Sequence, residues 1–105
     1  MHRSIVYLSG LPNDALTIAS GCELMMEDIA VITVHPWAEY ASSMGYALGD
    51  ISSLAESLIE RCDAVLFVPG WELSAECQLD LLLAEDYGVE IYYSIDELKK
   101  TWGLE

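Results

Sequence analysis

Three carboxylates in the second half of the chain are spaced so that they could serve one site: Glu72, Glu76 and Asp80. Glu76 and Asp80 stand at i and i+4 of a predicted helix, so they share one face of it, where like charges repel by roughly 0.2–0.5 kcal/mol per pair. The positive end of the helix dipole offsets part of that repulsion for Glu76. Carboxylates that converge on a crevice have perturbed pKa values. A polarised site, a docking stripe and an ordinary solvated face are the three interpretations.

The stretch from 62 to 80, CDAVLFVPGWELSAECQLD, must position these acids. Ala64–Val68 is an unbroken apolar run, typical of a strand that is buried on both faces. Pro69 and Gly70 end the run, and Ser74 can cap the helix that follows. The apolar positions predicted for that helix are Ala75, Leu79, Leu82 and Leu83. In open α/β sheets, ligands bind where such a strand passes into its helix.

The rest of the chain alternates predicted strands with predicted helices. The strands are Ile5–Leu8, Ile29–Val34 and Val89–Tyr93, and the helices run over about 14–28, 50–62 and 94–100. This alternation predicts a single α/β domain over residues 1–105, with helices on both faces of a parallel sheet. We expect a three-layer, flavodoxin-like or Rossmann-like open sheet of four strands in the order 2-1-3-4.

Two helical segments carry more detailed predictions. In the helix over 14–28, Gly21 permits close packing, and the helical spacing predicts one buried apolar face. That face comprises Ala15, Ile18, Ala19, Cys22, Met25 and Met26. In the last helix, Ser94 and Glu97 form a capping box. Trp37 to Gly49 has no clean period, so we expect a loop that partly covers the site.

A sheet of this order has its switch point between the first and third strands, and ligands bind at such points. Ser9 and Gly10 would line the crevice from one loop, and the segment Gly70 to Ser74 from the other, with backbone amides facing an anionic or sugar ligand. Five further residues have two interpretations each. Tyr7 is either a site residue or a core aromatic. Asp63 is either a ligand contact or an acid that bonds the backbone of a turn. Trp71, like Trp37 and Tyr40, either offers a platform for a nucleobase or packs against the core.

The charge of the chain limits its partners. Eighteen acids against four bases give a formal charge of −14 over 105 residues, 53% of which are apolar. Direct binding to nucleic acid is excluded on this balance, because it requires a cationic surface. An acidic surface that keeps the chain dispersed and an acidic face that docks on a basic partner both fit.

We expect neither a metal nor a cofactor. Cys22, Cys62 and Cys77 are odd in number and lack CxxC spacing, which indicates small buried hydrophobes in a reducing compartment. The two histidines are too scattered for a zinc site. No apolar run approaches the ~20 residues that cross a bilayer, and the N-terminus lacks a signal peptide. A cytoplasmic location is therefore expected.

Three segments together resemble a known family. YLSG at 7–10, CDAV at 62–65 and PGWExS at 69–74, followed by an acid at 80, resemble a small phage and bacterial family of unknown function that is related to the nucleoside 2-deoxyribosyltransferases. The similarity runs from about Tyr7 to Tyr92, and PGWExS after CDAV is its most specific part. In the transferases, a carboxylate attacks the anomeric carbon of a deoxyribosyl group, and an incoming base resolves the covalent intermediate.

The resemblance implies that Asp80 stands where the family has its nucleophilic glutamate, and Tyr7 where it has a tyrosine near that carboxylate. The chain departs from the family at several positions. Asp80 is one methylene shorter, which draws the carboxylate back from the sugar. Glu76 replaces a glycine, Ala55 replaces an aspartate that contacts base or sugar, and Leu11 precedes the loop proline. We therefore expect little or no deoxyribosyl transfer.

Three hypotheses follow. The first is a domain that binds a nucleoside or nucleotide derivative, with catalysis weak or lost. The second is an acidic, phage-encoded protein that inhibits a host protein in the host cytoplasm. The third is an active deoxyribosyltransferase or N-glycosidase with Asp80 as nucleophile. The fold relatives also suggest a homo-oligomer.

Overall fold

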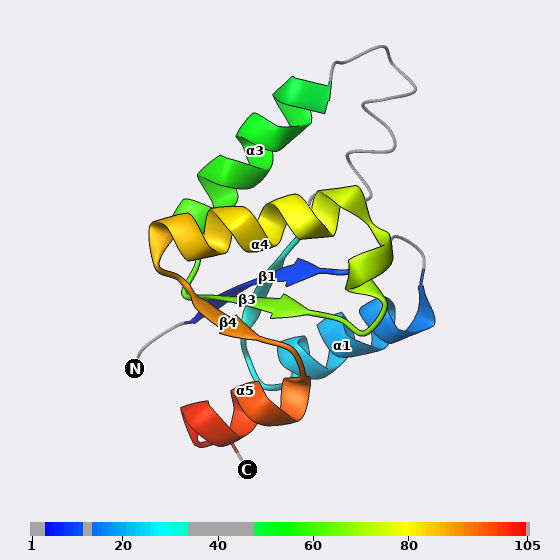
Figure 1. The fold of residues 1–105 in the computed structure, drawn as a ribbon. Helices are drawn as coiled ribbons and strands as arrows, with labels where there is room; N and C mark the ends of the chain where they lie inside the picture. The colour runs from blue at the N-terminus through cyan, green and yellow to red at the C-terminus, as the bar shows by residue number, and fades with distance from the viewer. Residues whose placement is uncertain (1–3, 12–13, 34–47, 105) are drawn as a thin grey trace.

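A computed structural model describes residues 4–11, 14–33 and 48–104, and Figure 1 shows their strands and helices. In chain order these are β1 (Ile5–Ser9), α1 (Ala15–Met26), β2 (Ala30–Ile32), α3 (Leu48–Arg61), β3 (Ala64–Phe67), the short 3-10 helix η1 (Trp71–Leu73), α4 (Ala75–Tyr87), β4 (Glu90–Tyr92) and α5 (Ile95–Trp102).

The four strands form one parallel sheet in the order β2-β1-β3-β4, which confirms the predicted fold class and strand order. Strands β1 and β3 are direct neighbours, with Tyr7 opposite Val65 and Ser9 opposite Phe67. Between consecutive strands, a helix (α1, α3 or α4) brings the chain back to the edge of the sheet at which the strands begin, as parallel pairing requires. The carboxyl ends of β1 and β3 therefore lie side by side, at the switch point of the sheet.

Helices cover both faces of the sheet, α1 and α5 on one side and α3 and α4 on the other (Figure 1). Because strand residues alternate between the faces, Val6 and Leu8 of β1 pack in the α1–α5 layer, whereas Tyr7 packs in the α3–α4 layer. The same alternation divides β3, with Leu66 in the first layer and Phe67 in the second. The sheet is therefore apolar on both faces, as its continuous apolar runs predict.

Helix α1 does not bury the face that its sequence pattern predicts. The buried residues are Gly21 and Leu24. On the predicted face, Ile18 is 58% exposed and Met26 is 87% exposed. The reason lies in close approach: a Cβ on Gly21 would stand 3.4 Å from the side chain of Leu8. The helix therefore lies against β1 on its Gly21 side, at a distance that a Cβ would also allow, and Leu24 fills the core beside it.

Helix α4 is also rotated relative to the prediction. Its buried residues are Cys77, Asp80 and Ala84, whereas Leu82 is 59% exposed. These three small side chains let the helix lie close to the sheet. A charged residue on the inner face is tolerated because its carboxylate accepts hydrogen bonds from β1, as described below.

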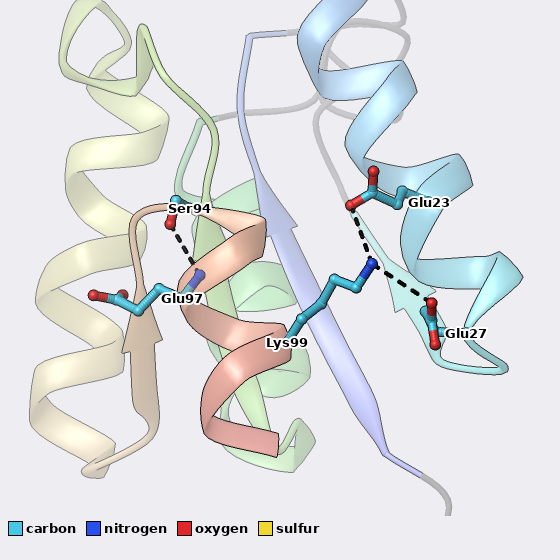
Figure 2. A network of polar contacts seen from close by, with 5 residues as sticks. All are labelled: Glu23, Glu27, Ser94, Glu97 and Lys99. Atoms are coloured by element: carbon cyan, nitrogen blue, oxygen red, sulfur yellow. Dashed lines mark hydrogen bonds and ion pairs between the residues drawn. The ribbon is translucent and has the colours of Figure 1, made fainter. Parts of the chain in front are cut away.

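Serine side chains cap the helices where the sequence predicts it. The Ser74 hydroxyl accepts from the amide of Cys77 at 3.3 Å, and the Ser94 hydroxyl accepts from the amide of Glu97 at 3.1 Å. The Ser94 bond is drawn in Figure 2.

One lysine connects the two helices of the lower layer in Figure 1. Lys99 on α5 reaches across to α1, where its Nζ lies 3.9 Å from a carboxylate oxygen of Glu23 and 3.6 Å from one of Glu27 (Figure 2). Both acids therefore lean towards α5.

Element boundaries differ slightly from the predictions. Strand β1 continues through Ser9, β2 ends at Ile32, and α3 begins at Leu48. The predicted covering loop from Trp37, with Tyr40, falls outside the described residues up to position 47. In the described part of the chain, no helix is both long enough and apolar enough to cross a membrane.

Candidate functional site

The candidate site begins with two side chains of β1, Tyr7 and Ser9. Both lie on the face of the sheet that α3 and α4 cover, because residues two apart in a strand point the same way. Both are fully buried. Ser9 is the last residue of the strand, and its carbonyl accepts from the amide of Val68 at 2.9 Å, which fixes it beside the end of β3.

Asp80 approaches these two hydroxyls from α4. Its Oδ2 accepts a hydrogen bond from the Ser9 hydroxyl at 2.8 Å, and its Oδ1 lies 3.4 Å from the Tyr7 hydroxyl, which donates to it. Asp80 is only 2% exposed. The predicted pairing of Tyr7 with the acid at position 80 is thus present in space, with the shorter bond made by Ser9.

The Tyr7 hydroxyl is a permanent donor. Burial, and then the neighbouring charge of Asp80, raises the pKa of Tyr7 well above its ordinary value. The phenol therefore stays protonated throughout the physiological range, and a protonated hydroxyl is what a buried carboxylate needs.

This arrangement orients a carboxylate and at the same time restrains it. Two hydroxyl donors hold the carboxyl group of Asp80 in one orientation. The same bonds draw electron density from its oxygens, and enclosure at 2% exposure limits its approach to an external carbon atom. The geometry suits a fixed hydrogen-bond acceptor better than an attacking nucleophile.

The β1–α1 turn is packed tightly at Gly10. A Cβ on Gly10 would lie 2.5 Å from Oγ1 of Thr17 and 3.0 Å from Cβ of Val68, so only glycine fits. The Thr17 Oγ1 atom itself is buried and finds no hydrogen-bond partner among the residues that the structure describes. Gly10 is therefore explained by the close contact between this turn, α1 and β3.

The second predicted loop lies beside the first. Gly70 adopts a left-handed conformation with φ of 99°, and a Cβ there would stand 3.6 Å from the side chain of Leu11 in the β1–α1 turn. Ser74, which is buried, caps α4 and also donates from its hydroxyl to Glu76 at 3.0 Å. The structure thus brings together the loops that follow β1 and β3, as the strand order predicts.

Trp71 packs into an aromatic cluster with Phe67 and Tyr93. Its ring centroid lies 5.1 Å from that of Phe67 and 5.8 Å from that of Tyr93. Trp71 is half-buried, and Tyr93 is exposed. Phe67 and Tyr93 were predicted only as strand residues, not as members of the site. Their positions in the sequence could have indicated this, because Phe67 ends β3 at the switch point and Tyr93 follows β4, the strand next to β3.

The three acids do not form one stripe. Glu72 and Glu76 are exposed, whereas Asp80 turns inward to β1. Glu90, on β4, accepts hydrogen bonds from the Tyr92 hydroxyl and from Nε1 of Trp102. The buried carboxyl group of Asp80 and the exposed carboxyl groups of Glu72 and Glu76 are thus separate features.

Asp63 lies at the other end of the sheet. Its Oδ2 accepts from the amide of Ile5 at 2.7 Å, and its own amide donates to the carbonyl of Ile5 at 2.8 Å. Both residues are at the amino ends of β1 and β3. Asp63 therefore secures the start of the strand pair, and the structure does not bring it to the candidate site.

The cysteines divide between core and surface. Cys62 and Cys77 are buried as predicted, but Cys22 is exposed, because α1 turns that face outward. Burial raises the pKa of Cys62 to about 11, which keeps its thiol protonated. Within the described ranges, no group of three or more histidine, cysteine, aspartate or glutamate side chains could hold a metal ion.

Protein-family models gave no match to this chain, and a search of curated proteins gave none either.

Proposed function

We propose that the chain binds a nucleoside or nucleotide derivative at the carboxyl edge of its sheet, in the cytoplasm, with catalysis weak or lost. The observation that carries this proposal is the buried contact of Asp80 with Ser9 and Tyr7. It joins, at the switch point of an open parallel sheet, the acid and the tyrosine that the resemblance to the deoxyribosyltransferases singles out.

Binding without efficient turnover is supported by two further features. Asp80 is enclosed and held back by its hydroxyl partners. Ala55, at the position where the resemblance implies a substrate-holding aspartate, is buried in the same apolar cluster as Tyr7. A methyl group there cannot accept a hydrogen bond from a sugar or a base.

The groups around the edge favour an uncharged nucleoside over a free phosphate. Glu72 and Glu76 are exposed carboxylates, which accept hydrogen bonds from sugar hydroxyls and repel phosphate. The half-buried indole of Trp71 offers a face for a base. A 2′-deoxynucleoside is accordingly the first probe.

The direct test is a titration of the labelled chain with 2′-deoxyadenosine and thymidine, followed by NMR of the backbone amides. We expect shifts at Gly10, Gly70 and Trp71 that saturate, and weaker binding in Glu76→Gln. The matched control is Glu85→Gln, an exposed acid further along α4. If no amide of either loop responds to millimolar nucleoside, the binding proposal is wrong.

A second assay separates binding from turnover. Incubation with a deoxynucleoside and a free base should give little or no base exchange, and Asp80→Glu alone should not restore it, because Ala55 still leaves the substrate poorly held. Rapid exchange that Asp80→Ala abolishes would instead establish the active transferase or N-glycosidase.

A second candidate function, docking on a basic host protein, is favoured by a cluster of acids on the α3–α4 surface. Partial desolvation, a hydrogen bond to Glu56 and the nearby charges of Glu60 and Asp86 raise the pKa of Tyr87. Glu56, Glu60 and Asp86 thus contribute negative charge near one exposed phenol, on a chain of charge −14.

Docking of this kind is steered by charge, so the on-rate should fall steeply as ionic strength rises. The probe is a pull-down from host lysate at low and high salt. Glu56→Gln with Glu60→Gln is compared against Asp96→Asn, an exposed acid on α5. No retention at low salt, or retention that salt does not change, contradicts docking.

A further inference from the structure

Three aromatic side chains gather at the carboxyl ends of β3 and β4, and we call them the aromatic platform: Phe67, Trp71 and Tyr93. Their ring centroids lie 5.1, 5.7 and 5.8 Å apart in the three pairs, and Tyr93 is inclined by only 27° to Phe67 and 33° to Trp71. Phe67 is fully buried, whereas Trp71 is half-buried and Tyr93 is 47% exposed. The aromatic platform is therefore anchored in the core and reaches the surface through two rings.

The two rings at the surface are held by the main chain on which they stand. The amide of Trp71 donates to the carbonyl of Val68 at 3.1 Å. The amide of Tyr93 donates to the side chain of Glu97 at 3.3 Å, in the capping box that starts α5. A ligand that stacks on these rings meets a surface that is already ordered, so it loses little affinity to ordering them.

The charges beside the aromatic platform are negative. Glu72 directly follows Trp71 in η1, Glu76 lies in the first turn of α4, and both are exposed. The basic side chains of the described residues lie in the last turns of α3 and α5: Arg61, Lys99 and Lys100. The last turn of α3 precedes the amino end of β3, and Lys99 contacts acids of α1 (Figure 2). The segments 9–14 and 68–76, which form the two site loops, contain no basic residue.

An aromatic face beside carboxylates suits a positive charge. A cation over the face of an aromatic ring is attracted by the ring quadrupole, most strongly by tryptophan. The carboxylates of Glu72 and Glu76 attract the same charge and accept hydrogen bonds from N–H groups. The charge of −14 on the whole chain also favours the approach of a cation. A neutral base gains stacking alone from this surface, whereas a positively charged base gains all three interactions.

We propose that the ligand of this edge is a nucleoside whose base carries a positive charge, stacked on the aromatic platform with Glu72 and Glu76 beside it. N-alkylated purines and pyridinium rings share this chemistry. The inference rests on the proposed function, because it concerns the same binding edge, and it narrows the class of nucleoside.

A matched pair of nucleosides tests the charge. We compare 7-methylguanosine with guanosine by isothermal titration calorimetry at pH 6, where the methylated base is a cation. We expect the methylated nucleoside to bind about tenfold more tightly. That preference should shrink at high salt, because salt screens the carboxylates. Nicotinamide riboside is the pyridinium probe: tighter binding of either cation than of guanosine supports the proposal, and the tighter of the two identifies the ring.

Substitutions at the edge test the location. Glu72→Gln and Glu76→Gln, made separately, should each reduce the preference for 7-methylguanosine about threefold. Glu85→Gln is the matched control, because it removes the same charge from an exposed residue in the last turn of α4 and should leave the preference unchanged. Tyr93→Leu removes an exposed ring of the aromatic platform and should also reduce the preference.

The outcomes separate this inference from the proposed function. If guanosine binds as tightly as both cations, or if Glu85→Gln lowers the preference as much as Glu72→Gln and Glu76→Gln do, the inference is wrong and nucleoside binding stands. If 2′-deoxyadenosine, thymidine, guanosine and the two cations all fail to bind, both are wrong.

Discussion

The two ends of the β1–β3 pair each hold an aspartate, and the two aspartates do opposite things. At the amino end, Asp63 is exposed and bonds to the main chain of Ile5. At the carboxyl end, Asp80 is buried and accepts from two side-chain hydroxyls of β1. The first secures a strand start. The second places a buried polar group at the edge where open sheets bind ligands, a costly arrangement that strand geometry alone does not require.

The largest expected effect comes from removing the buried carboxylate. Asp80→Ala leaves the Ser9 and Tyr7 hydroxyls without this acceptor, at about 1–3 kcal/mol for each buried group left unpaired. We expect the free energy of unfolding to fall by about 2–4 kcal/mol in urea. Asp63→Ala, the matched change at the amino end, should cost at most about 1 kcal/mol, because water can replace one exposed bond. Equal losses would show that the two ends do not differ.

A glycine pair extends the comparison to the backbone. Gly10→Ala places a Cβ 2.5 Å from Oγ1 of Thr17 and 3.0 Å from Val68, so we expect a loss of about 1–3 kcal/mol from overpacking. Gly21→Ala meets only Leu8, at 3.4 Å, and gains about 0.5–1 kcal/mol of helix propensity. Thermal unfolding of the two variants measures the difference. A neutral Gly10→Ala would mean that the turn at the carboxyl end relaxes easily.

Alkaline pH should lower the free energy of unfolding through two buried groups, Tyr7 and Cys62. Burial raises the pKa of Tyr7 and raises that of Cys62 from 9.0 to about 11. Both groups keep their protons longer when folded than when unfolded, so stability is full below pH 9 and falls as pH rises above it. Urea unfolding at pH 8 and pH 10.5 measures this loss. Tyr7→Phe and Cys62→Ala should each reduce it, and an unchanged loss in both variants would contradict the assignment.

The smallest expected effect is a gain in stability on replacing Thr17. Thr17→Val keeps the shape of a side chain whose buried hydroxyl has no hydrogen-bond partner within the described part of the chain, and should raise the free energy of unfolding by up to about 1 kcal/mol. Thr17→Ser keeps the hydroxyl and removes a methyl group, so it should be destabilising. Urea unfolding of the two variants separates the free-energy cost of burying the hydroxyl from the contribution of the methyl group to packing.

The sheet was predictable because its strands are short apolar runs separated by turn residues, and alternation with helices leaves few topologies. The site loops followed from the strand order, since the loop at Gly10 follows β1, the loop at Gly70 follows β3, and these two strands are neighbours. Ser9 itself was predicted as a loop contact, yet it ends β1 and gives Asp80 its shorter hydrogen bond. Its role depends on a partner far away in the sequence, which no local pattern shows.

Helix orientation was not predictable in the same way. Helix α1 has apolar residues on almost every side. The spacing of Ile18, Cys22 and Met25 therefore fitted a core-facing stripe as well as the face that is actually buried, at Gly21 and Leu24. On α4 the inner face consists of small side chains and one acid, while leucines reach the surface. Periodicity finds an apolar stripe, and it does not say whether the stripe meets the sheet or faces outward.

The hydroxyl contacts of Asp80 also constrain the order in which the chain folds. Tyr7 and Ser9 precede Asp80 by 73 and 71 positions, and β1 lies between β2 and β3 rather than at an edge. During synthesis, β1 can therefore pair with β3, and its hydroxyls can meet Asp80, only after β3 and α4 have been made. Closing such long loops is slow, because entropy is lost before any contact repays it. The contacts of Asp80 thus form only where β1 and β3 are neighbours and α4 lies over them, so they report that these three elements have been assembled correctly.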